Sequence, residues 1–525
     1  MGRFGLISGS YRSQSLTADA QMTMGFYPEA IESENGKAAM ALYPCPGESL
    51  FCTIPGGGPS RAELEINGRA FVISGPNFCE VFANQTFNVI NQVANDNQNA
   101  SMVASPQQLL IASGGSLYVY WLQTTMGGTN PQPAGTFVKI PGAQFTLPNG
   151  AQGAVQQVEF MDGFFIILLA NSQTMYLSAL FDASTWLVVG VPQIIIVSVF
   201  SDNVQSICVS QRRLWVMGRK RSTAYYDSGS ANVFDVDPSA TMENGTAALW
   251  ATFRLDNAVF WLDQDERGLG IVRRGVGYVP TRISNHAIEY AIQSYSTIAD
   301  CTAYGYQDQG HSFGVFNFPT ANKTWVYDVA TGMWHERGYW NQQTATFSRH
   351  KSQNHMLAFG KHLVGDPSSG NIYQMAIPSS AVGGGYNFVT DNGNPIRRVR
   401  RSPHISVENK FTFYNELILD FETGLGPIPP LLDGAGNDRG PEVMLRWSRD
   451  YGHTWSNQYV LDAGQAGNYR QRVRRTRMGR ARDMVFEISV TDPIPWRLIE
   501  GYIDADGPSP YKPQSRLVST YGKVT

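Results

Sequence analysis

The stretch QLLIASGGSLYVYW, residues 108–121, sets a pattern that much of the chain repeats. Two apolar runs of strand length, Gln108–Ala112 and Ser116–Trp121, flank a Gly114-Gly115 pair. The second run alternates aliphatic and aromatic residues in Leu117–Tyr120. Alternating runs that are separated by turn residues are typical of antiparallel strands. The stretch therefore predicts a β-hairpin.

Six further units of the same kind occur along the chain, and the seven units are spaced by about 48 residues on average. The two runs of each further unit are Arg69–Ser74 and Phe78–Phe82, Gly163–Ala170 and Thr174–Leu177, Arg213–Gly218 and Thr223–Tyr226, Ala258–Leu262 and Gly268–Arg273, Ser312–Phe318 and Thr324–Asp328, and His355–Gly360 and Gly370–Met375. Four short strands with their turns fit a unit of this length, which is the size of a propeller blade. The repeat predicts an all-β chain with a β-propeller of six or seven blades, and an array of ordinary β-sandwiches is the alternative. The continuously apolar run Phe164–Ala170 fits a strand that is buried on both faces between two blades.

The pattern changes along the chain and divides it into four parts. Residues 1–43 show no strong periodicity and are expected to form an extended N-terminal arm, which leads into the propeller at 44–394. Longer strands follow a turn-rich break near 391–395, and they predict a β-sandwich of jelly-roll type over 395–510 with a C-terminal tail at 511–525. The expected long strands are Phe413–Phe421, Glu442–Trp447, Tyr469–Arg477 and Met484–Val490.

Composition limits the classes of protein to which this chain can belong. The 525 residues carry a net charge of −3, which argues against a protein that coats nucleic acid. The charge is uneven, because residues 395–525 hold 19 Lys and Arg against 15 Asp and Glu. The five Cys are scattered without metal-like spacing, so buried free thiols are expected, with no disulfide framework and no zinc site. The N-terminus has no signal-peptide pattern and no apolar run is long enough to cross a bilayer, which predicts a soluble protein made in a reducing cytoplasm.

The sharpest local motif is SRDYGHTW, residues 448–455, which fits the Asp-box pattern S-x-D-x-G-x-T-W. In such a box the aspartate accepts backbone hydrogen bonds across a turn, the glycine takes a positive φ and the tryptophan anchors the following strand. Asp-boxes occur in sialidases and in many other β-proteins, where they are structural. The predicted structural residues are Ser448, Asp450, Gly452, Thr454 and Trp455.

The densest group of charges is the arginine run Arg470, Arg472, Arg474, Arg475 and Arg477, which Arg480 and Arg482 continue. From Arg470 to Arg474 every second residue is an arginine, so a strand would carry these side chains on one face. A solvated strand face is one interpretation. The alternatives are a surface for acidic protein neighbours or for the DNA backbone. Arg397, Arg398, Arg400 and Arg401 pose the same question.

Enzyme chemistry has no support in the sequence. His311, His335, His350 and His355 lack the carboxylate or cysteine spacing of a metal site and are interpreted as ordinary surface or core residues. Asp263 and Asp265 are loop residues and do not form a recognisable glycosidase pair. The nucleophile-elbow, P-loop and dinucleotide-binding motifs are absent. We therefore predict that the protein is not an enzyme and that it has no catalytic, metal-binding or cofactor-binding residues.

Several short segments together resemble one protein family. In the C-terminal part these are LRWSRDYGHTW at 445–455, AGNYR at 466–470, MGRARD at 478–483, VFEI at 485–488 and TDPIP at 491–495. Upstream they are FYPE at 26–29, YPCPG at 43–47, GHSF at 310–313, TWVYD at 324–328 and WHER at 334–337. This combination resembles the packaged-DNA stabilisation proteins, or tail-nozzle (tail hub) proteins, of short-tailed double-stranded-DNA bacteriophages. The sequence departs from the family's pattern at two places, at Met24 in the arm and at Arg449 with Tyr451 in the box. Both departures concern only the contacts with neighbouring proteins.

The resemblance implies a structural protein of the phage tail, assembled in the host bacterial cytoplasm. Such a protein forms a ring, expected to be a homohexamer, below the portal and its adaptor protein. The ring continues the DNA channel and carries tail fibres or tailspikes, so genomic DNA passes through its lumen and no membrane insertion is expected.

Two other functions remain open at this point. One is a glycan-binding or depolymerising tail component with a sialidase-like propeller, and the other is a general propeller scaffold for protein partners. The number of blades, the ring stoichiometry, the loops that contact neighbours, the face that lines the channel and the host stay undecided.

Overall fold

The computed structural model describes residues 2–33, 35–125, 132–188, 191–230, 233–265 and 267–506. In these ranges the chain is almost entirely β-structure, with one α-helix, α1 (His286–Gln293), and one 3-10 helix, η1 (Gly142–Gln144). Neither described helix has the length and apolar character needed to span a membrane. The chain forms two compact units. The propeller unit holds residues 48–332 and 347–376, and the sandwich unit holds residues 1–47, 333–346 and those from 377 onward.

Seven sheets of the propeller unit, counted over the described residues, are arranged as blades round a closed ring. Their first strands contact one another in the order β7, β11, β15, β20, β24, β28 and β33, and β33 contacts β7 again. These strands are β7 (Ser60–Ile66), β11 (Ser101–Ala104), β15 (Val155–Met161), β20 (Val204–Ser210), β24 (Thr252–Leu255), β28 (Thr302–Asp308) and β33 (His355–Ala358). The all-β fold with a propeller is therefore confirmed, and the number of blades that the sequence left open is seven.

Antiparallel strands extend each blade from its first strand. The second strands are β8 (Arg69–Ser74), β12 (Gln108–Ser113), β16 (Phe164–Leu169), β21 (Arg213–Gly218), β25 (Ala258–Gln264), β29 (His311–Phe318) and β34 (Lys361–Gly365). The third strands are β9 (Asn77–Val81), β13 (Ser116–Trp121), β17 (Thr174–Leu177), β22 (Ser222–Asp227), β26 (Gly270–Val276), β30 (Lys323–Asp328) and β35 (Asn371–Ala376). The outer strands are β10 (Phe87–Gln92), β14 (Phe137–Ile140), β18 (Leu187–Val188) with β19 (Val191–Ile196), β23 (Phe234–Val236) and β27 (Val279–Arg282).

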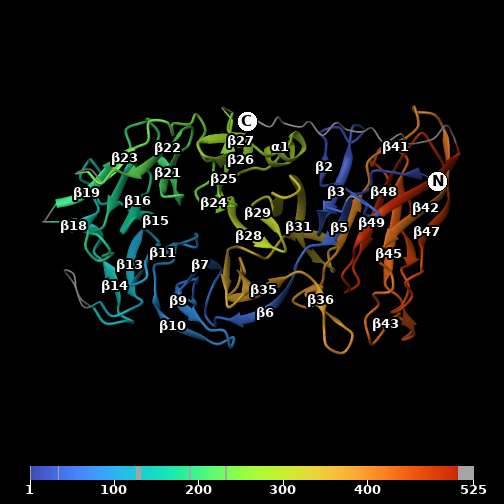
Figure 1. The fold of residues 1–525 in the computed structure, drawn as a ribbon, viewed down its shortest axis with the longest axis horizontal. Helices are drawn as coiled ribbons and strands as arrows, with labels where there is room; N and C mark the ends of the chain where they lie inside the picture. Colours follow the sequence, from blue (N-terminus) through green and yellow to red (C-terminus); the bar gives the residue numbers. More distant parts are fainter. Residues whose placement is uncertain are drawn as a thin grey trace. The chain divides into compact units, whose positions relative to one another are not determined.

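The seventh blade is built from both ends of the propeller sequence. Strand β6 (Gly47–Thr53), which precedes the first blade, lies beside β35 and completes the order β33-β34-β35-β6 (Figure 1). The Thr53 hydroxyl donates a hydrogen bond of 2.7 Å to Asn371 Oδ1, across 318 residues of sequence. This contact between distant segments closes the ring.

The cores of the propeller lie between neighbouring blades, and β16 shows how the sequence produces them. Phe165, Ile167 and Leu169 pack into the cluster shared with β12 and β13, whereas Ile166 and Leu168 pack into the cluster shared with β20 and β21. Side chains alternate between the two faces of a strand, so both faces of β16 are apolar. The continuous apolar run predicted exactly this kind of doubly buried strand, although it ends at Leu169 in the structure.

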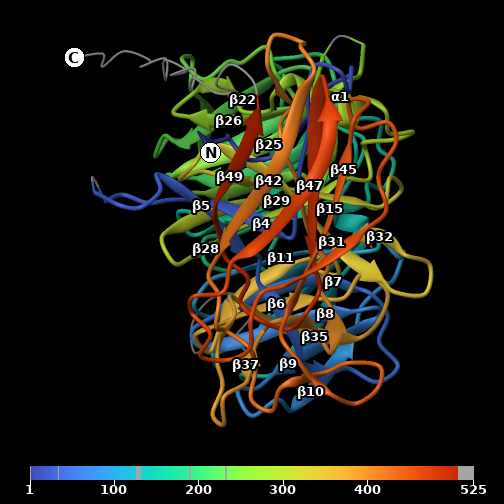
Figure 2. The same ribbon diagram turned by 90° about the vertical axis from the view of Figure 1, so that its right-hand side faces the viewer.

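The sandwich unit contains two sheets, antiparallel except for the parallel pair β3 and β31, and several short strand pairs. The first sheet has the order β4 (Phe26–Ala30), β5 (Met40–Pro44), β49 (Leu498–Asp506), β42 (Thr412–Phe421) and β47 (Val473–Ala481), with β1 (Gly2–Arg3) on β49. In Figure 2 strands β49, β42 and β47 run side by side. The second sheet includes β31 (Met333–Asn341), β3 (Ala20–Met24), β40 (Arg398–Arg401), β48 (Asp483–Val490), β45 (Glu442–Ser448) and β46 (Tyr459–Asp462), with β2 (Tyr11–Arg12) on β3 and β41 (Ile405–Ser406) on β48.

The remaining short strands are β32 (Thr346–Arg349) and three antiparallel pairs, β36 (Ser379–Ser380) with β37 (Tyr386–Asn387), β38 (Thr390–Asp391) with β39 (Asn394–Pro395), and β43 (Leu431–Leu432) with β44 (Asp438–Arg439).

The N-terminal residues differ from the extended arm that the sequence predicted for 1–43. Strands β1 to β5 lie in this segment and pair within the sandwich unit, β1 with β49 and β3 with β40. Phe4 and Leu6 are buried in the same apolar core as Trp447 and Trp496. Besides the local pairs β2 with β3 and β4 with β5, the strands β1, β3 and β5 pair with β49 and β40, which lie hundreds of residues later. The segment is therefore folded although it shows no local repeat.

The predicted boundaries of the domains change accordingly. Residues 333–346 and 377–394, which the sequence placed in the propeller, belong to the sandwich unit. Three of the four long strands were predicted within one or two residues, but the strand expected at Tyr469–Arg477 is β47, which begins at Val473 and ends at Ala481. The predicted C-terminal tail at 511–525 lies outside the described residues.

Candidate functional site

The turn between β45 and β46 holds the Asp-box residues and is stabilised by side-chain hydrogen bonds. Asp450 Oδ1 accepts from the Thr454 N–H (2.8 Å) and from the Ser448 hydroxyl (2.7 Å), and the Thr454 hydroxyl donates to Oδ2 (2.6 Å). Ser448 Oγ accepts from the Gly452 N–H at 2.8 Å. Tyr451 and Gly452 have φ values of +63° and +92°, a backbone region in which glycine is favoured. The motif therefore forms a compact turn.

The Asp450 carboxylate serves this turn as an anion. Desolvation raises its pKa, but the hydrogen bonds from Thr454 and Ser448 outweigh that effect and bring the pKa down to about 2. The group is thus ionised at neutral pH, and its oxygens accept bonds from the turn itself.

Trp455, the last residue of the box, packs between charged side chains and is half-buried. The guanidinium carbons of Arg401 and Arg446 lie 4.8 and 4.9 Å from the centre of its ring. Both arginines also bind the buried Glu487, at 2.7 Å each. Cation–π contacts and an ion triad from β40, β45 and β48 therefore hold Trp455 against the second sheet.

The arginines at 397–401 do not form a surface patch, because Arg398 and Arg400 are fully buried in the sandwich unit. Arg400 donates to the Leu6 carbonyl (2.6 Å), to Gln21 Oε1 (2.6 Å) and to Thr23 Oγ1 (2.8 Å). Burial lowers the pKa of Arg400 to about 9 and that of Arg398 to about 10. Arg400 clamps the N-terminal strands onto β40, so it serves the fold and is not available to a partner or to DNA.

The second group of arginines is divided between a turn and a strand. Arg470 and Arg472 lie in the turn that precedes β47, whereas Arg474, Arg475 and Arg477 lie on β47 itself. The expectation that the run shares one strand face is therefore wrong for Arg470 and Arg472.

A bulge in β47 explains the arrangement of the remaining arginines. Arg477 has a φ of +59°, and the pairing register with β42 shifts between Tyr414 and Glu416. Val473 and Met478 are both fully buried. Because an odd number of positions separates them, regular alternation would place their side chains on opposite faces. A bulge adds one residue and so changes which side chains face inward.

Strand β47 is also the last strand of its sheet. Arg474 lies 3.5 Å from Glu416, and the Arg475 guanidinium lies 3.8 Å from the centre of the Tyr459 ring. Exposed cations on an edge strand oppose pairing with another strand, so these arginines protect the edge as well as offering charge to a partner.

A groove of about 830 Å³ lies beside this edge, in the sandwich unit. Its lining includes four basic side chains and two acidic ones, namely Lys37, Arg470, Arg472 and Arg497 with Asp420 and Glu422. Lys37 pairs with Asp420 and Arg497 with Glu422 (2.6 Å), which leaves a surplus of positive charge at the exposed Arg470 and Arg472. Tyr469, which is 72% exposed, lies next to them. The groove is suited to an anionic partner.

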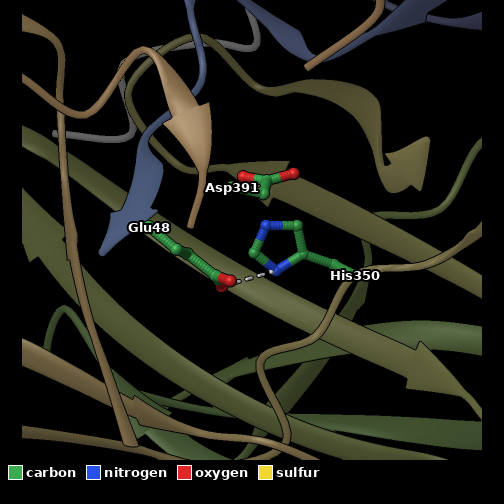
Figure 3. A group of neighbouring side chains, drawn as sticks. All are labelled: Glu48, His350 and Asp391. Carbon is green, nitrogen blue, oxygen red and sulfur yellow. Dashed lines mark ion pairs between the residues drawn. The ribbon is translucent and has the colours of Figure 1, made fainter. Parts of the chain in front are cut away.

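The histidines singled out in the sequence lie in both units. His311 Nδ1 is 2.9 Å from Asp328 Oδ2, and both side chains are buried. In the propeller unit the His350 and Glu48 side chains point toward each other, with Nδ1 and Oε1 3.5 Å apart (Figure 3). His335 is fully buried in the sandwich unit.

His355 has a partner that the sequence did not indicate. Its Nε2 lies 2.9 Å from Nδ1 of His362 on the neighbouring strand. The Phe359-Gly360 turn between the two strands is the signal that could have revealed this pair, because a two-residue turn sets the register of a hairpin.

The acidic pair Asp263 and Asp265 has two separate roles. Asp263 is buried and binds Arg273 and the Asn244 side chain. Asp265 accepts hydrogen bonds from the N–H groups of Arg267 (2.9 Å) and Leu269 (2.8 Å) within its loop. Both carboxylates thus stabilise local structure.

Solved structures are similar to this chain only at a low level. The extracellular domain of a protein assigned to a hybrid two component system of B. thetaiotaomicron is 8% identical, with a TM-score of 0.39 over 78% of this chain and 47% of that one. The N-terminal domain of Nup159 is 9% identical, with a TM-score of 0.37 over 68% of this chain and 98% of that one. The chain spans about half the length of the first of these structures. No curated protein matches the chain.

Two family matches together cover most of the chain in the order of its folded parts. The family described as "Bacteriophage P22 Gp10, beta-propeller" matches residues 3–380, and "Bacteriophage P22 Gp10, beta-sandwich" matches residues 397–506. The blades and the C-terminal sandwich strands described above fall within these two ranges. The chain therefore belongs to the bacteriophage P22 Gp10 family of virion structural proteins.

Proposed function

We propose that this protein is the tail nozzle of a short-tailed phage and that it helps to retain packaged DNA. In this role it forms a homohexameric ring below the portal and its adaptor, continues the DNA channel, and carries fibres or spikes. The observation that supports the proposal most is the match of both parts of the chain to the P22 Gp10 family.

The build of the propeller unit suits a tube wall. Side chains such as Phe165 and Ile166 fill the space between blades on both faces of a strand, and close-packed interiors of this kind deform little. In a cyclic ring every copy uses the same pair of contact surfaces, so one stiff unit is enough to build the whole wall.

The charge distribution suits the two kinds of contact that a nozzle makes. Residues 1–394 hold 21 Lys and Arg against 28 Asp and Glu, which are the totals of 40 and 43 less the 19 and 15 found in residues 395–525. An acidic body repels moving DNA, whereas the groove and edge strand at Arg470, Arg472 and Arg474 offer positive charge to acidic protein neighbours.

The test compares phage particles that contain or lack this protein. Without it, heads are expected to package a genome and then lose it, because packaged DNA is under pressure from like-charge repulsion and the exit is not closed. The measurement is the amount of nuclease-protected DNA in purified heads over time, with wild-type particles as control. Heads that keep their DNA and fail only in adsorption to cells would instead show a fibre or receptor-binding protein.

A further inference from the structure

A type I′ hairpin in the seventh blade places two histidines side by side. Phe359 and Gly360 form the turn, with φ values of +56° and +69°. In the pairing of β33 with β34, Leu357 lies opposite His362 and Val364 lies opposite His355. Residues 355, 357, 362 and 364 therefore share one face of the hairpin. The diagonal pair on this face is His355 and His362, with Nε2 and Nδ1 2.9 Å apart.

Aromatic side chains of the sixth blade hold both imidazoles in place. The Tyr304 ring stacks on His355, with ring centres 5.7 Å apart and planes inclined by 12°. The Tyr306 ring lies 5.6 Å from the His355 ring and 5.5 Å from the His362 ring. The two histidines are thus fixed before any ligand arrives, which reduces the entropy lost on binding.

The pair borders a cavity of about 590 Å³ in the propeller unit. The cavity is also lined by Tyr306, Arg254 and Asp256. Arg254 donates a 2.9 Å hydrogen bond to the Val209 carbonyl. Because both histidines belong to the lining, a small solute in the cavity can reach the imidazoles.

Imidazole nitrogen is a common ligand of transition metal ions. Two nitrogens bound to one tetrahedral Zn²⁺ at about 2.0–2.1 Å lie roughly 3.3 Å apart, so a small opening of the pair admits the ion.

We propose that His355 and His362 form a site for a borderline divalent transition metal ion such as Zn²⁺, with water from the cavity completing the coordination shell. His355 binds through Nε2 and His362 through Nδ1. Each ring then carries its hydrogen on the other nitrogen, so the hydrogen bond between the rings is exchanged for two metal bonds. The site links β33 to β34.

The experiment titrates the purified full-length protein with Zn²⁺ by calorimetry at pH 7.5. Wild-type protein is expected to bind one equivalent of Zn²⁺. His362→Gln and His355→Gln should each weaken the affinity for this ion at least tenfold. The exposed His286 gives a matched control, so His286→Gln should leave this binding unchanged. Co²⁺ in place of Zn²⁺ should give an absorption spectrum of nitrogen-coordinated metal that both variants lose.

A second measurement does not depend on the folding of any variant. Diethyl pyrocarbonate modifies accessible histidines, and Zn²⁺ should protect His355 and His362 of the wild-type protein while His286 stays reactive. Peptide mapping by mass spectrometry reports each position. Unchanged modification of His355 and His362 with Zn²⁺, or equal Zn²⁺ affinity in wild type and variants, would overturn the proposal.

Discussion

Glu63 on β7 is a single residue whose ionisation should affect the stability of the propeller. Burial raises its pKa to about 8, although the Ser60 hydroxyl donates to its carboxylate at 3.0 Å. A glutamate in the unfolded chain has a pKa of about 4.3. Between these values the folded chain keeps a proton that the unfolded chain has released, so Glu63 lowers the stability of the folded protein as pH rises from about 4 to about 8.

Glu63→Gln should remove this pH dependence, because glutamine does not ionise. We expect the melting temperature of the variant to rise relative to that of the wild type as pH is raised from 5 to 9. Glu65→Gln, on the same strand, is the control and should follow the wild type. Parallel melting curves of the Glu63 variant and the wild type across this range would contradict the assignment.

Asp450 is the residue on which the Asp-box turn depends. Asp450→Ala removes the acceptor of three hydrogen bonds and should cost about 1–3 kcal/mol. Asp450→Asn keeps one carbonyl acceptor and should lie between alanine and wild type. Hydrogen exchange of the β45 and β46 backbone measures the effect locally, and unchanged protection in the alanine variant would show that the turn does not need the carboxylate.

At the scale of elements, the packing between blades should decide the stability of the propeller. Phe165 on β16 is fully buried, whereas Phe181 of the same blade is 54% exposed. Phe165→Ala should therefore cost about 3–5 kcal/mol and Phe181→Ala about 0.5 kcal/mol or less. Urea unfolding midpoints of the two variants give the comparison, and similar midpoints would mean that the core does not lie between the blades.

The edge strand β47 and the turn before it should act in assembly. Charge reversal at Arg472 and Arg474 places carboxylates where the proposed neighbours are acidic, so ring formation or docking to the adaptor should weaken at least tenfold. Arg212→Glu in the propeller unit is the control, because Arg212 is also exposed. Analytical ultracentrifugation and adaptor pull-down measure the two contacts. Normal assembly combined with leakage of packaged DNA would instead show that these arginines hold DNA.

Elements were predictable from the sequence where their partners are local. The hairpin at 108–121 pairs Gln108 with Trp121 and Ser113 with Ser116, as its turn and alternation indicate. Strands β1, β3 and β5 were missed because they pair with β40 and β49, which lie far along the chain. The start of β47 was misplaced because the alternation of arginines begins in the turn before the strand, and its end was misplaced because the bulge at Arg477 breaks the alternation.

Site residues likewise could be predicted where their contacts are local and not where their contacts come from distant segments. The Asp-box turn follows from eight consecutive residues, so its hydrogen bonds could be anticipated. The burial of Arg400 could not, because its partners Leu6, Gln21 and Thr23 come from the opposite end of the chain. The pairing of His355 with His362 was missed because the sequence analysis continued the first run to Gly360 and did not place a turn at Phe359-Gly360.

At the scale of the whole molecule, the small net negative charge predicts weak attraction to DNA. A chain with 40 basic and 43 acidic residues releases few counterions from a duplex, and nonspecific affinity depends mainly on that release. We expect no measurable binding of the purified protein to duplex DNA at about 0.15 M salt. A filter-binding or anisotropy titration checks this, and strong binding with a steep salt dependence would contradict the repulsive lining proposed for the channel.

The closure of the blade ring by β6 and β35 also sets a schedule for biosynthesis. Thr53 leaves the ribosome 318 residues before its partner Asn371. At a synthesis rate of about 5–20 residues per second, β6 waits roughly 15–60 s for its partner strand β35. During this interval six blades can form, but none of them can complete the ring of blades. A nascent chain can therefore close its propeller only when its last blade emerges.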